Sequence, residues 1–243
     1  MRMINFAKRN FKELIRDPFS LIFEIVLPLF LLFIFQKFNI PAENYRLENF
    51  TPSIILFGFS FITLFSATLI SKDRTSSLLI RLGTSPMKSR DYILGYIASL
   101  LPIVLIQNIL FFTVAVLLGL EFSISIIPTI LVSLVISIFF ISTGILIGSL
   151  VSEKGTGALG SVIVQLVCFT SGMYFPKDVI GGVFAVICKS LPFEACLNIL
   201  QGTLHNDFSN LKVAHIIVFS IYFIGIILLS ILAFKKKMIS DNK

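Results

Sequence analysis

Residues 72–92 read KDRTSSLLIRLGTSPMKSRDY, and this basic stretch decides how the rest of the chain must fold. It lies between two long apolar segments, residues 51–71 and 93–118. Apolar segments of that length are stable in lipid, whereas a stretch that carries cations must stay in water. The chain therefore leaves the membrane and returns to it here. The cations that the loop presents to a soluble partner are Lys72, Arg74, Arg81, Lys88 and Arg90.

The composition is that of an integral membrane protein. Hydrophobic residues make up 56% of the 243 residues and charged residues only 14%, which is too little polar surface for a soluble domain of this length. The net charge of +7 does not indicate nucleic-acid binding, because the basic residues lie beside apolar spans, where they set topology. The cysteines lack the spacing of a metal or redox site, so we expect buried thiols or, alternatively, a Cys188–Cys196 disulfide.

Six segments are predicted to be transmembrane helices, each of which needs about 20 apolar residues to cross about 30 Å of hydrocarbon. They are residues 19–38, 51–71, 93–118, 128–150, 159–175 and 213–234. With six spans both termini lie on one side, and that side carries fifteen Lys and Arg residues against five on the other. Since basic loops stay in the cytoplasm, the sequence predicts a multi-pass, all-α membrane protein with both termini cytoplasmic.

Two further segments are predicted to be helical without crossing the membrane. In residues 1–17, apolar residues recur at steps of three and four from Ile4 to Leu14 and cations line the opposite face, which predicts an amphipathic interfacial helix ended by Asp17-Pro18. The alternative is a simple topology signal. Residues 176–210 are apolar but interrupted, and they predict two short helices that re-enter the membrane from outside.

The basic loop itself has a helical pattern. Arg74, Leu78 and Arg81 fall on one stripe of a helix, and Gly83 can end that helix in the left-handed conformation. Ser85-Pro86 is typical of the N-cap and first position of a second helix that leads into the third span. The sequence thus predicts an organised helix–turn–helix over residues 72–92. The alternative is a solvated connector bound to lipid headgroups.

Together with the interfacial helix, three stretches resemble the ABC-2 type permeases, the single-module transmembrane subunits of bacterial ABC exporters. They are the loop from Lys72-Asp-Arg to Leu82-Gly-Thr-Ser-Pro, the Gly172-x-x-Phe-Pro end of the fifth predicted span, and Leu191-Pro-Phe in the re-entrant segment. The resemblance runs over nearly the whole chain. It implies one ABC-2 type transmembrane domain over residues 1–243.

The resemblance also implies a set of partners. Two such permeases, identical or different, would pair around a translocation path in membrane lipid, with two cytoplasmic ABC ATPase subunits docked beneath them. The loop would carry a coupling helix that contacts the ATPase through Arg74, Leu78, Arg81, Leu82, Gly83 and Thr84. The stretch Lys154-Gly-Thr-Gly has the wrong order for a phosphate-binding loop. ATP and Mg²⁺ are therefore expected on the partner subunit, and no cofactor, metal or catalytic residue on this chain.

A second set of residues is expected to line the translocation path or the contact between permeases. Glu24 is a carboxylate within the first predicted span, and a carboxylate at the bilayer centre costs roughly 2.5–3.5 kcal/mol. It should therefore face a helix or a cavity rather than lipid, either in the path or as a structural carboxylate. The full set is Glu24, Pro28, Gln165, Phe169, Gly172, Phe175 and Pro176.

The expected function is ATP-driven export of an amphipathic or hydrophobic substrate, such as a drug, an antimicrobial peptide or a lipid. Small external loops and an apolar interior favour a substrate that partitions into the membrane. Export of polysaccharide or teichoic acid is the alternative within the same family. An ion-coupled secondary transporter or channel would need several intramembrane charges, and a membrane-embedded enzyme would need a nucleophile–base pair or metal ligands.

Overall fold

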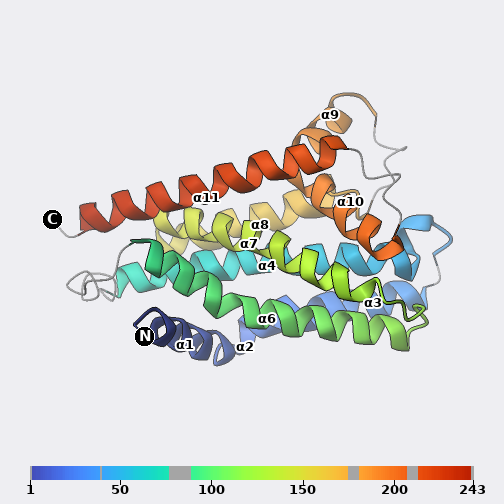
Figure 1. The fold of residues 1–243 in the computed structure, drawn as a ribbon, viewed down its shortest axis with the longest axis horizontal. Coiled ribbons are helices and arrows are strands. Elements are labelled where there is room, and N and C mark those ends of the chain that lie inside the picture. The colour runs from blue at the N-terminus through green and yellow to red at the C-terminus, as the bar shows by residue number, and fades with distance from the viewer. Residues whose placement is uncertain (1, 39, 77–88, 175–180, 207–212, 242–243) are drawn as a thin grey trace.

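The computed structural model describes residues 2–38, 40–76, 89–174, 181–206 and 213–241, and the regular elements in these ranges are helices. Figure 1 shows an elongated bundle with both termini at one end and α9 and α10 towards the other. The all-α prediction is therefore confirmed. The elements are α1 (Arg2–Ile15), α2 (Pro18–Leu21), the π-helix η1 (Ile22–Val26), α3 (Leu27–Lys37), the 3-10 helix η2 (Glu43–Tyr45), α4 (Leu47–Thr75), α6 (Ser89–Leu117), α7 (Ile126–Leu150), α8 (Glu153–Thr170), α9 (Gly182–Ser190), α10 (Pro192–His205) and α11 (Val213–Asp241).

Five stretches of helix within the described residues are long and apolar enough to cross a membrane. The predicted fifth span, residues 159–175, falls on α8, which begins earlier and ends at Thr170 and is not one of the five. Its first turns hold Glu153, Lys154 and two glycines, which shorten its apolar part. The short helices expected in residues 176–210 are α9 and α10, bent by 70° against each other. The six-span count and the re-entry of this pair remain predictions. The five stretches are Pro18–Lys37, Leu47–Thr75, Ser89–Leu117, Ile126–Leu150 and Val213–Lys237.

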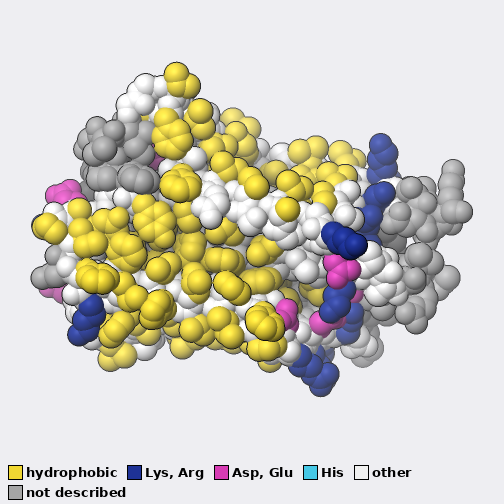
Figure 2. Space-filling model, turned by 180° about the vertical axis from the view of Figure 1, so that it is seen from behind, with side chains coloured by type: hydrophobic (Ala, Val, Ile, Leu, Met, Phe, Trp, Pro, Cys, Tyr) yellow, Lys and Arg dark blue, Asp and Glu magenta, His cyan; other side chains and the backbone are white. Residues whose placement is uncertain are grey.

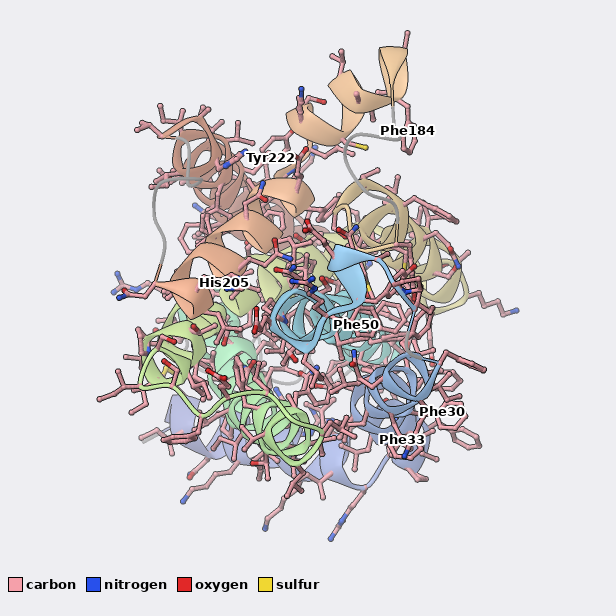
Figure 3. The ribbon with its side chains drawn as sticks, turned by 90° about the vertical axis from the view of Figure 1, so that its right-hand side faces the viewer. Phe30, Phe33, Phe50, Phe184, His205 and Tyr222 are labelled. Carbon is pink, nitrogen blue, oxygen red and sulfur yellow. The ribbon has the colours of Figure 1, made fainter. Side chains whose placement is uncertain are left out.

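Helix α4 forms the centre of the bundle. Every residue from Phe50 to Thr63 is buried, so this part of the helix is covered on all sides. Its neighbours include α3, α6, α7, α8 and α10. Figure 3 shows the contrast with the periphery, since Phe50 lies inside the bundle whereas Phe30 and Phe33 of α3 point outward. A helix that is apolar all round belongs in such a position.

The contact between α4 and α7 depends on two glycines four residues apart. A Cβ atom on Gly148 would lie 2.5 Å from the Ala67 carbonyl oxygen, and one on Gly144 would lie 2.5 Å from the Thr63 carbonyl oxygen. The Thr63 hydroxyl donates a hydrogen bond of 3.0 Å to the Phe140 carbonyl across the same contact. Small residues at this spacing let two helix backbones approach closely, which is how membrane helices gain packing energy.

Two local predictions are confirmed. Helix α1 ends at Ile15, and the Asp17 carboxylate caps the next helix by accepting hydrogen bonds from the backbone N–H groups of Phe19 and Ser20 at 3.2 and 3.5 Å. The three cysteines are free and buried, as the first of the two alternatives expected. On the outside, Figure 2 shows an apolar surface over most of the bundle, with Lys, Arg, Asp and Glu side chains gathered towards one end.

Candidate functional site

A buried carboxylate marks the end of α4, at the start of the basic loop. Asp73 is 1% exposed. The Nη1 atom of Arg9 in α1 donates to both carboxylate oxygens of Asp73, at 2.7 and 2.9 Å. The Tyr96 hydroxyl of α6 donates to Oδ2 of Asp73 at 2.9 Å. A buried carboxylate needs such a cation and such donors to be tolerated. Three helices therefore meet at one charge, and we call Arg9, Asp73 and Tyr96 the anchor triad.

Aromatic packing holds α1 in the place that the anchor triad requires. The Phe6 ring lies edge-on to the rings of Tyr92 and Tyr96, with centroid distances of 5.5 and 5.0 Å. Gly95 leaves room for it, since a Cβ there would lie 2.6 Å from a Phe6 ring carbon. The face of α1 that packs on the bundle is thus centred on Phe6 and Ala7, whereas Ile4 of the predicted apolar stripe is 52% exposed.

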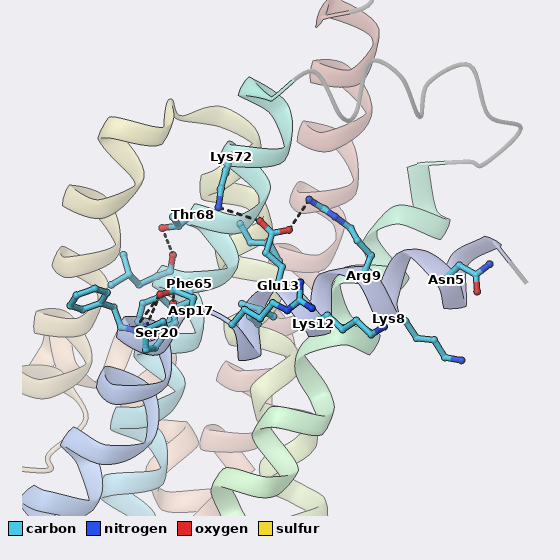
Figure 4. A pocket seen from close by; sticks show the side chains of 16 residues that line it. Asn5, Lys8, Arg9, Lys12, Glu13, Asp17, Ser20, Phe65, Thr68 and Lys72 are labelled. Atoms are coloured by element: carbon cyan, nitrogen blue, oxygen red, sulfur yellow. Dashed lines mark hydrogen bonds and ion pairs between the residues drawn. The ribbon is translucent and has the colours of Figure 1, made fainter.

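A more exposed set of charges surrounds the anchor triad. Glu13 accepts from Arg9 Nη2 at 2.7 Å and from Lys72 Nζ at 3.3 Å, and it lies between the two cations in Figure 4. The Arg9 side chain is 39% exposed and that of Lys72 57% exposed. Water screens pairs of this kind, so each contributes at most about 1 kcal/mol. They orient α1 more than they stabilise it.

Arg74, the residue after Asp73, connects α4 to α7. Its Nη1 atom donates to the carbonyls of Gly148 and Ser149 at 2.8 Å each and to that of Val151 at 3.3 Å. These are carbonyls at the end of α7 that lack a helical donor, and a cation is favourable there. The sequence placed Arg74 in the contact with the ATPase, which stays a prediction. Leu78, Arg81, Leu82, Gly83 and Thr84, the other residues of that contact, lie outside the described residues.

Sequence reasoning missed the anchor triad. Asp73 was noted only as part of the Lys72-Asp-Arg motif, and Arg9 only as one of the interfacial cations. A signal was available, because an acidic residue at the end of an apolar helix needs a cation, and residues 2–16 bring five of them to the same predicted side of the membrane. A second signal is the pair Tyr92 and Tyr96 at the start of the next span, because residues four apart lie on the same face of a helix.

The intramembrane candidates Glu24 and Pro28 belong to the first span. Glu24 is 1% exposed, as expected for a carboxylate that avoids lipid, and it lies in the π-helix η1. Pro28 has no N–H to offer to the Glu24 carbonyl, and the Gln107 side-chain amide of α6 donates to that carbonyl at 3.4 Å instead. The Gln107 amide passes over Gly58 of α4, where a side chain would collide with it. The first span is thus joined to α4 and α6.

The other candidates lie on α8 and directly after it. Gln165 and Phe169 are exposed on one face of α8, four residues apart, beside an apolar hollow of about 510 Å³ that Phe184 of α9 closes on one side. Gly172 follows the helix with φ +86°, a conformation that favours glycine, and its carbonyl accepts from Asn44 Nδ2 at 3.1 Å. Phe175 and Pro176 lie outside the described residues. The expected set is therefore split between two regions.

A second contact pins the end of α8 to the segment between the first two spans. The Tyr45 hydroxyl donates to the Tyr174 carbonyl at 3.1 Å, and the Tyr45 ring stacks on Phe35 with a centroid distance of 5.1 Å. Burial raises the pKa of the Tyr45 hydroxyl above its ordinary value, at which the group is already protonated at neutral pH. Together with the Asn44 contact, this fixes the Gly172 turn at the end of the bundle opposite the anchor triad.

Comparison with known proteins adds the family. The model of the ABC-2 type transporter family matches residues 3–205, which include α1, the anchor triad and all helices up to α10. No curated protein matches the chain significantly. Permeases of this family are the membrane part of transporters whose ATP is hydrolysed by an ABC ATPase subunit. With several membrane-spanning helices and a family match over most of its length, the chain belongs to the ABC-2 type transporters as a multi-pass permease.

Proposed function

We propose that the chain is the permease of an ATP-driven exporter, and that residues 72–92 receive the motion of the ATPase. The observation that carries this proposal is the anchor triad at the base of the loop. Asp73 joins α4 to α1 and α6, and Arg74 joins α4 to α7. A displacement of the loop therefore acts on four helices together.

In the proposed assembly two permeases surround the path, and two cytoplasmic ATPases carry ATP and Mg²⁺. Arg74, Leu78, Arg81, Leu82, Gly83 and Thr84 form the ATPase contact. The basic ends of the helices would face the cytoplasm, which agrees with the gathering of charged side chains towards one end of the bundle. Glu24, Pro28, Gln165, Phe169, Gly172, Phe175 and Pro176 serve the path or the contact between the two permeases.

The open face of α8 supports a path or a subunit contact there. Gln165 is polar and exposed on a helix whose neighbouring exposed residues include Val162, Leu166 and Phe169. A carboxamide exposed to hydrocarbon would lack hydrogen-bond partners, so this face is better suited to a second permease or to a passing substrate. The apolar hollow beside it suits a drug, peptide or lipid with a large apolar surface.

The experiment uses everted membrane vesicles that contain the chain and the ATPase that copurifies with it. An exporter should accumulate a fluorescent hydrophobic drug inside these vesicles when ATP is supplied. Leu78→Asp, alone or with Arg81→Glu, should abolish ATPase association and accumulation at unchanged membrane expression, because hot spots of such contacts are worth a few kcal/mol. Gly83→Val should impair transport by straining the turn.

Lys154→Glu is the matched control, since Lys154 is an exposed cation of the same predicted side but lies on α8 outside the loop. It should leave ATPase association intact. Normal association and accumulation with Leu78→Asp would show that the loop is only a connector. ATP-dependent loss of drug from the vesicles would contradict export.

A further inference from the structure

A groove runs along α1 where it crosses the bundle. It has a volume of about 1020 Å³ and lies between α1, the start of the first span and the last turns of α4. Figure 4 shows Asn5 at one end of α1 and Asp17, Ser20 and Phe65 at the other, with Lys72 on α4. The groove is at the upper end of the roughly 300–1,000 Å³ typical of small-molecule sites.

The side chains that line the groove carry a net positive charge. Five Lys and Arg side chains line it against two carboxylates. Both carboxylates are engaged, because Glu13 pairs with Arg9 and Lys72 and Asp17 caps α2 and accepts from the Ser20 hydroxyl at 2.6 Å. Among the described residues, no carboxylate lies within ion-pair distance of the three remaining cations, Lys8, Lys12 and Arg16.

The other wall of the groove is apolar. Leu64 and Phe65 of α4 line it, together with Phe19 at the start of the first span, which is 72% exposed. Phe65 and Lys72 are seven positions apart on α4, or roughly 10 Å at 1.5 Å per residue, so the groove is long enough to hold both a charged headgroup and the start of an apolar chain.

From this arrangement we infer that the groove binds one anionic phospholipid of the leaflet in which α1 lies. The phosphate is held by Lys8, Lys12 and Arg16, and an acyl chain follows Phe19 and Phe65. Charge complementarity selects an anionic headgroup over a zwitterionic one. A free phosphate would match the rim but would leave the apolar wall uncovered. The bound lipid lies between α1 and α4, directly beside the anchor triad.

The test is a titration of the full-length, delipidated chain in detergent with dioleoyl phosphatidylglycerol, followed by native mass spectrometry. One lipid should remain bound per chain. Each cation near an anionic lipid is worth about a fivefold change in affinity, so Lys12→Gln with Arg16→Gln should weaken binding about 30-fold. Lys235→Gln with Lys236→Gln is the matched control, because it removes two exposed cations from the same end of the bundle on α11 and should leave binding unchanged.

Three further measurements complete the test. Dioleoyl phosphatidylcholine should bind much more weakly, millimolar inorganic phosphate should not displace the bound lipid, and Phe19→Ser, which keeps every charge, should weaken binding. Equal losses in the groove and control pairs would overturn the proposal in favour of unspecific attraction to the basic end. Equal binding of both lipids, displacement by phosphate, or unchanged binding by Phe19→Ser would overturn it as well. These readouts do not involve the ATPase, so they stand or fall independently of export.

Discussion

Replacing Asp73 by Ala should loosen α1 on the bundle while the spans stay folded. Asp73 is the acceptor that α1 and α6 share, and its loss removes two hydrogen bonds from Arg9 and one from Tyr96. The Tyr96 side chain is fully buried, so its hydroxyl would be left without this partner. Phe6 would still pack on Tyr92 and Tyr96, so we expect a loosened α1 and not global unfolding.

The size of the effect follows from the exposure of the partners. Hydrogen bonds to charged groups contribute about 1.5–3 kcal/mol each, and breaking a fully buried ion pair costs about 3–5 kcal/mol. Arg9, however, is 39% exposed and keeps Glu13 at 2.7 Å, so water and Glu13 compensate for part of the loss. We therefore expect the local opening of α1 to become easier by about 2–3 kcal/mol, which corresponds to a factor of about 30–160.

Hydrogen exchange of the α1 backbone amides, measured by mass spectrometry in lipid nanodiscs, reports this opening directly. Exchange in α1 should accelerate by that factor in Asp73→Ala, whereas exchange in α7 and α10 should not change. Lys72→Ala is the matched control, because Lys72 is 57% exposed and its pair with Glu13 should be worth at most about fivefold. If α1 exchanges at the same rate in Asp73→Ala and in the unaltered protein, the anchor triad does not hold α1.

Two other predictions concern packing and topology. Gly148→Ala should destabilise the protein by about 1–3 kcal/mol and lower its thermal midpoint, because the new Cβ would lie 2.5 Å from the Ala67 carbonyl oxygen. Gly157→Ala is the control and should be neutral or stabilising, since a Cβ there has nothing within 4 Å. Equal thermal midpoints of the two variants would contradict the close contact of α4 and α7. With both termini cytoplasmic, a cysteine in place of exposed Glu121 should react with an impermeant thiol reagent in whole cells, and one in place of exposed Lys154 should not. The three native thiols are buried and should not react. Equal labelling at the two positions would refute the predicted orientation.

The sequence by itself determined the class of the protein and the position of its most informative loop. Both depend on composition and on the length of apolar segments, which act locally and need no knowledge of neighbours. The end of α1 at Asp17 was predictable for the same reason, since the cap bonds to the backbone of Phe19 and Ser20, two and three residues away. The family likewise followed from short stretches such as Lys72-Asp-Arg.

Only the tertiary structure decided which side chains meet. Asp73 is 64 residues from Arg9 and 23 from Tyr96, and Arg74 is 74 residues from the Gly148 carbonyl that it binds. Hydrophobicity cannot choose among such partners, because in a membrane helix the lipid-facing and the protein-facing sides are about equally apolar. The choice is made by close steric fit and by the need of each buried polar group for a partner, and both exist only once the helices have packed.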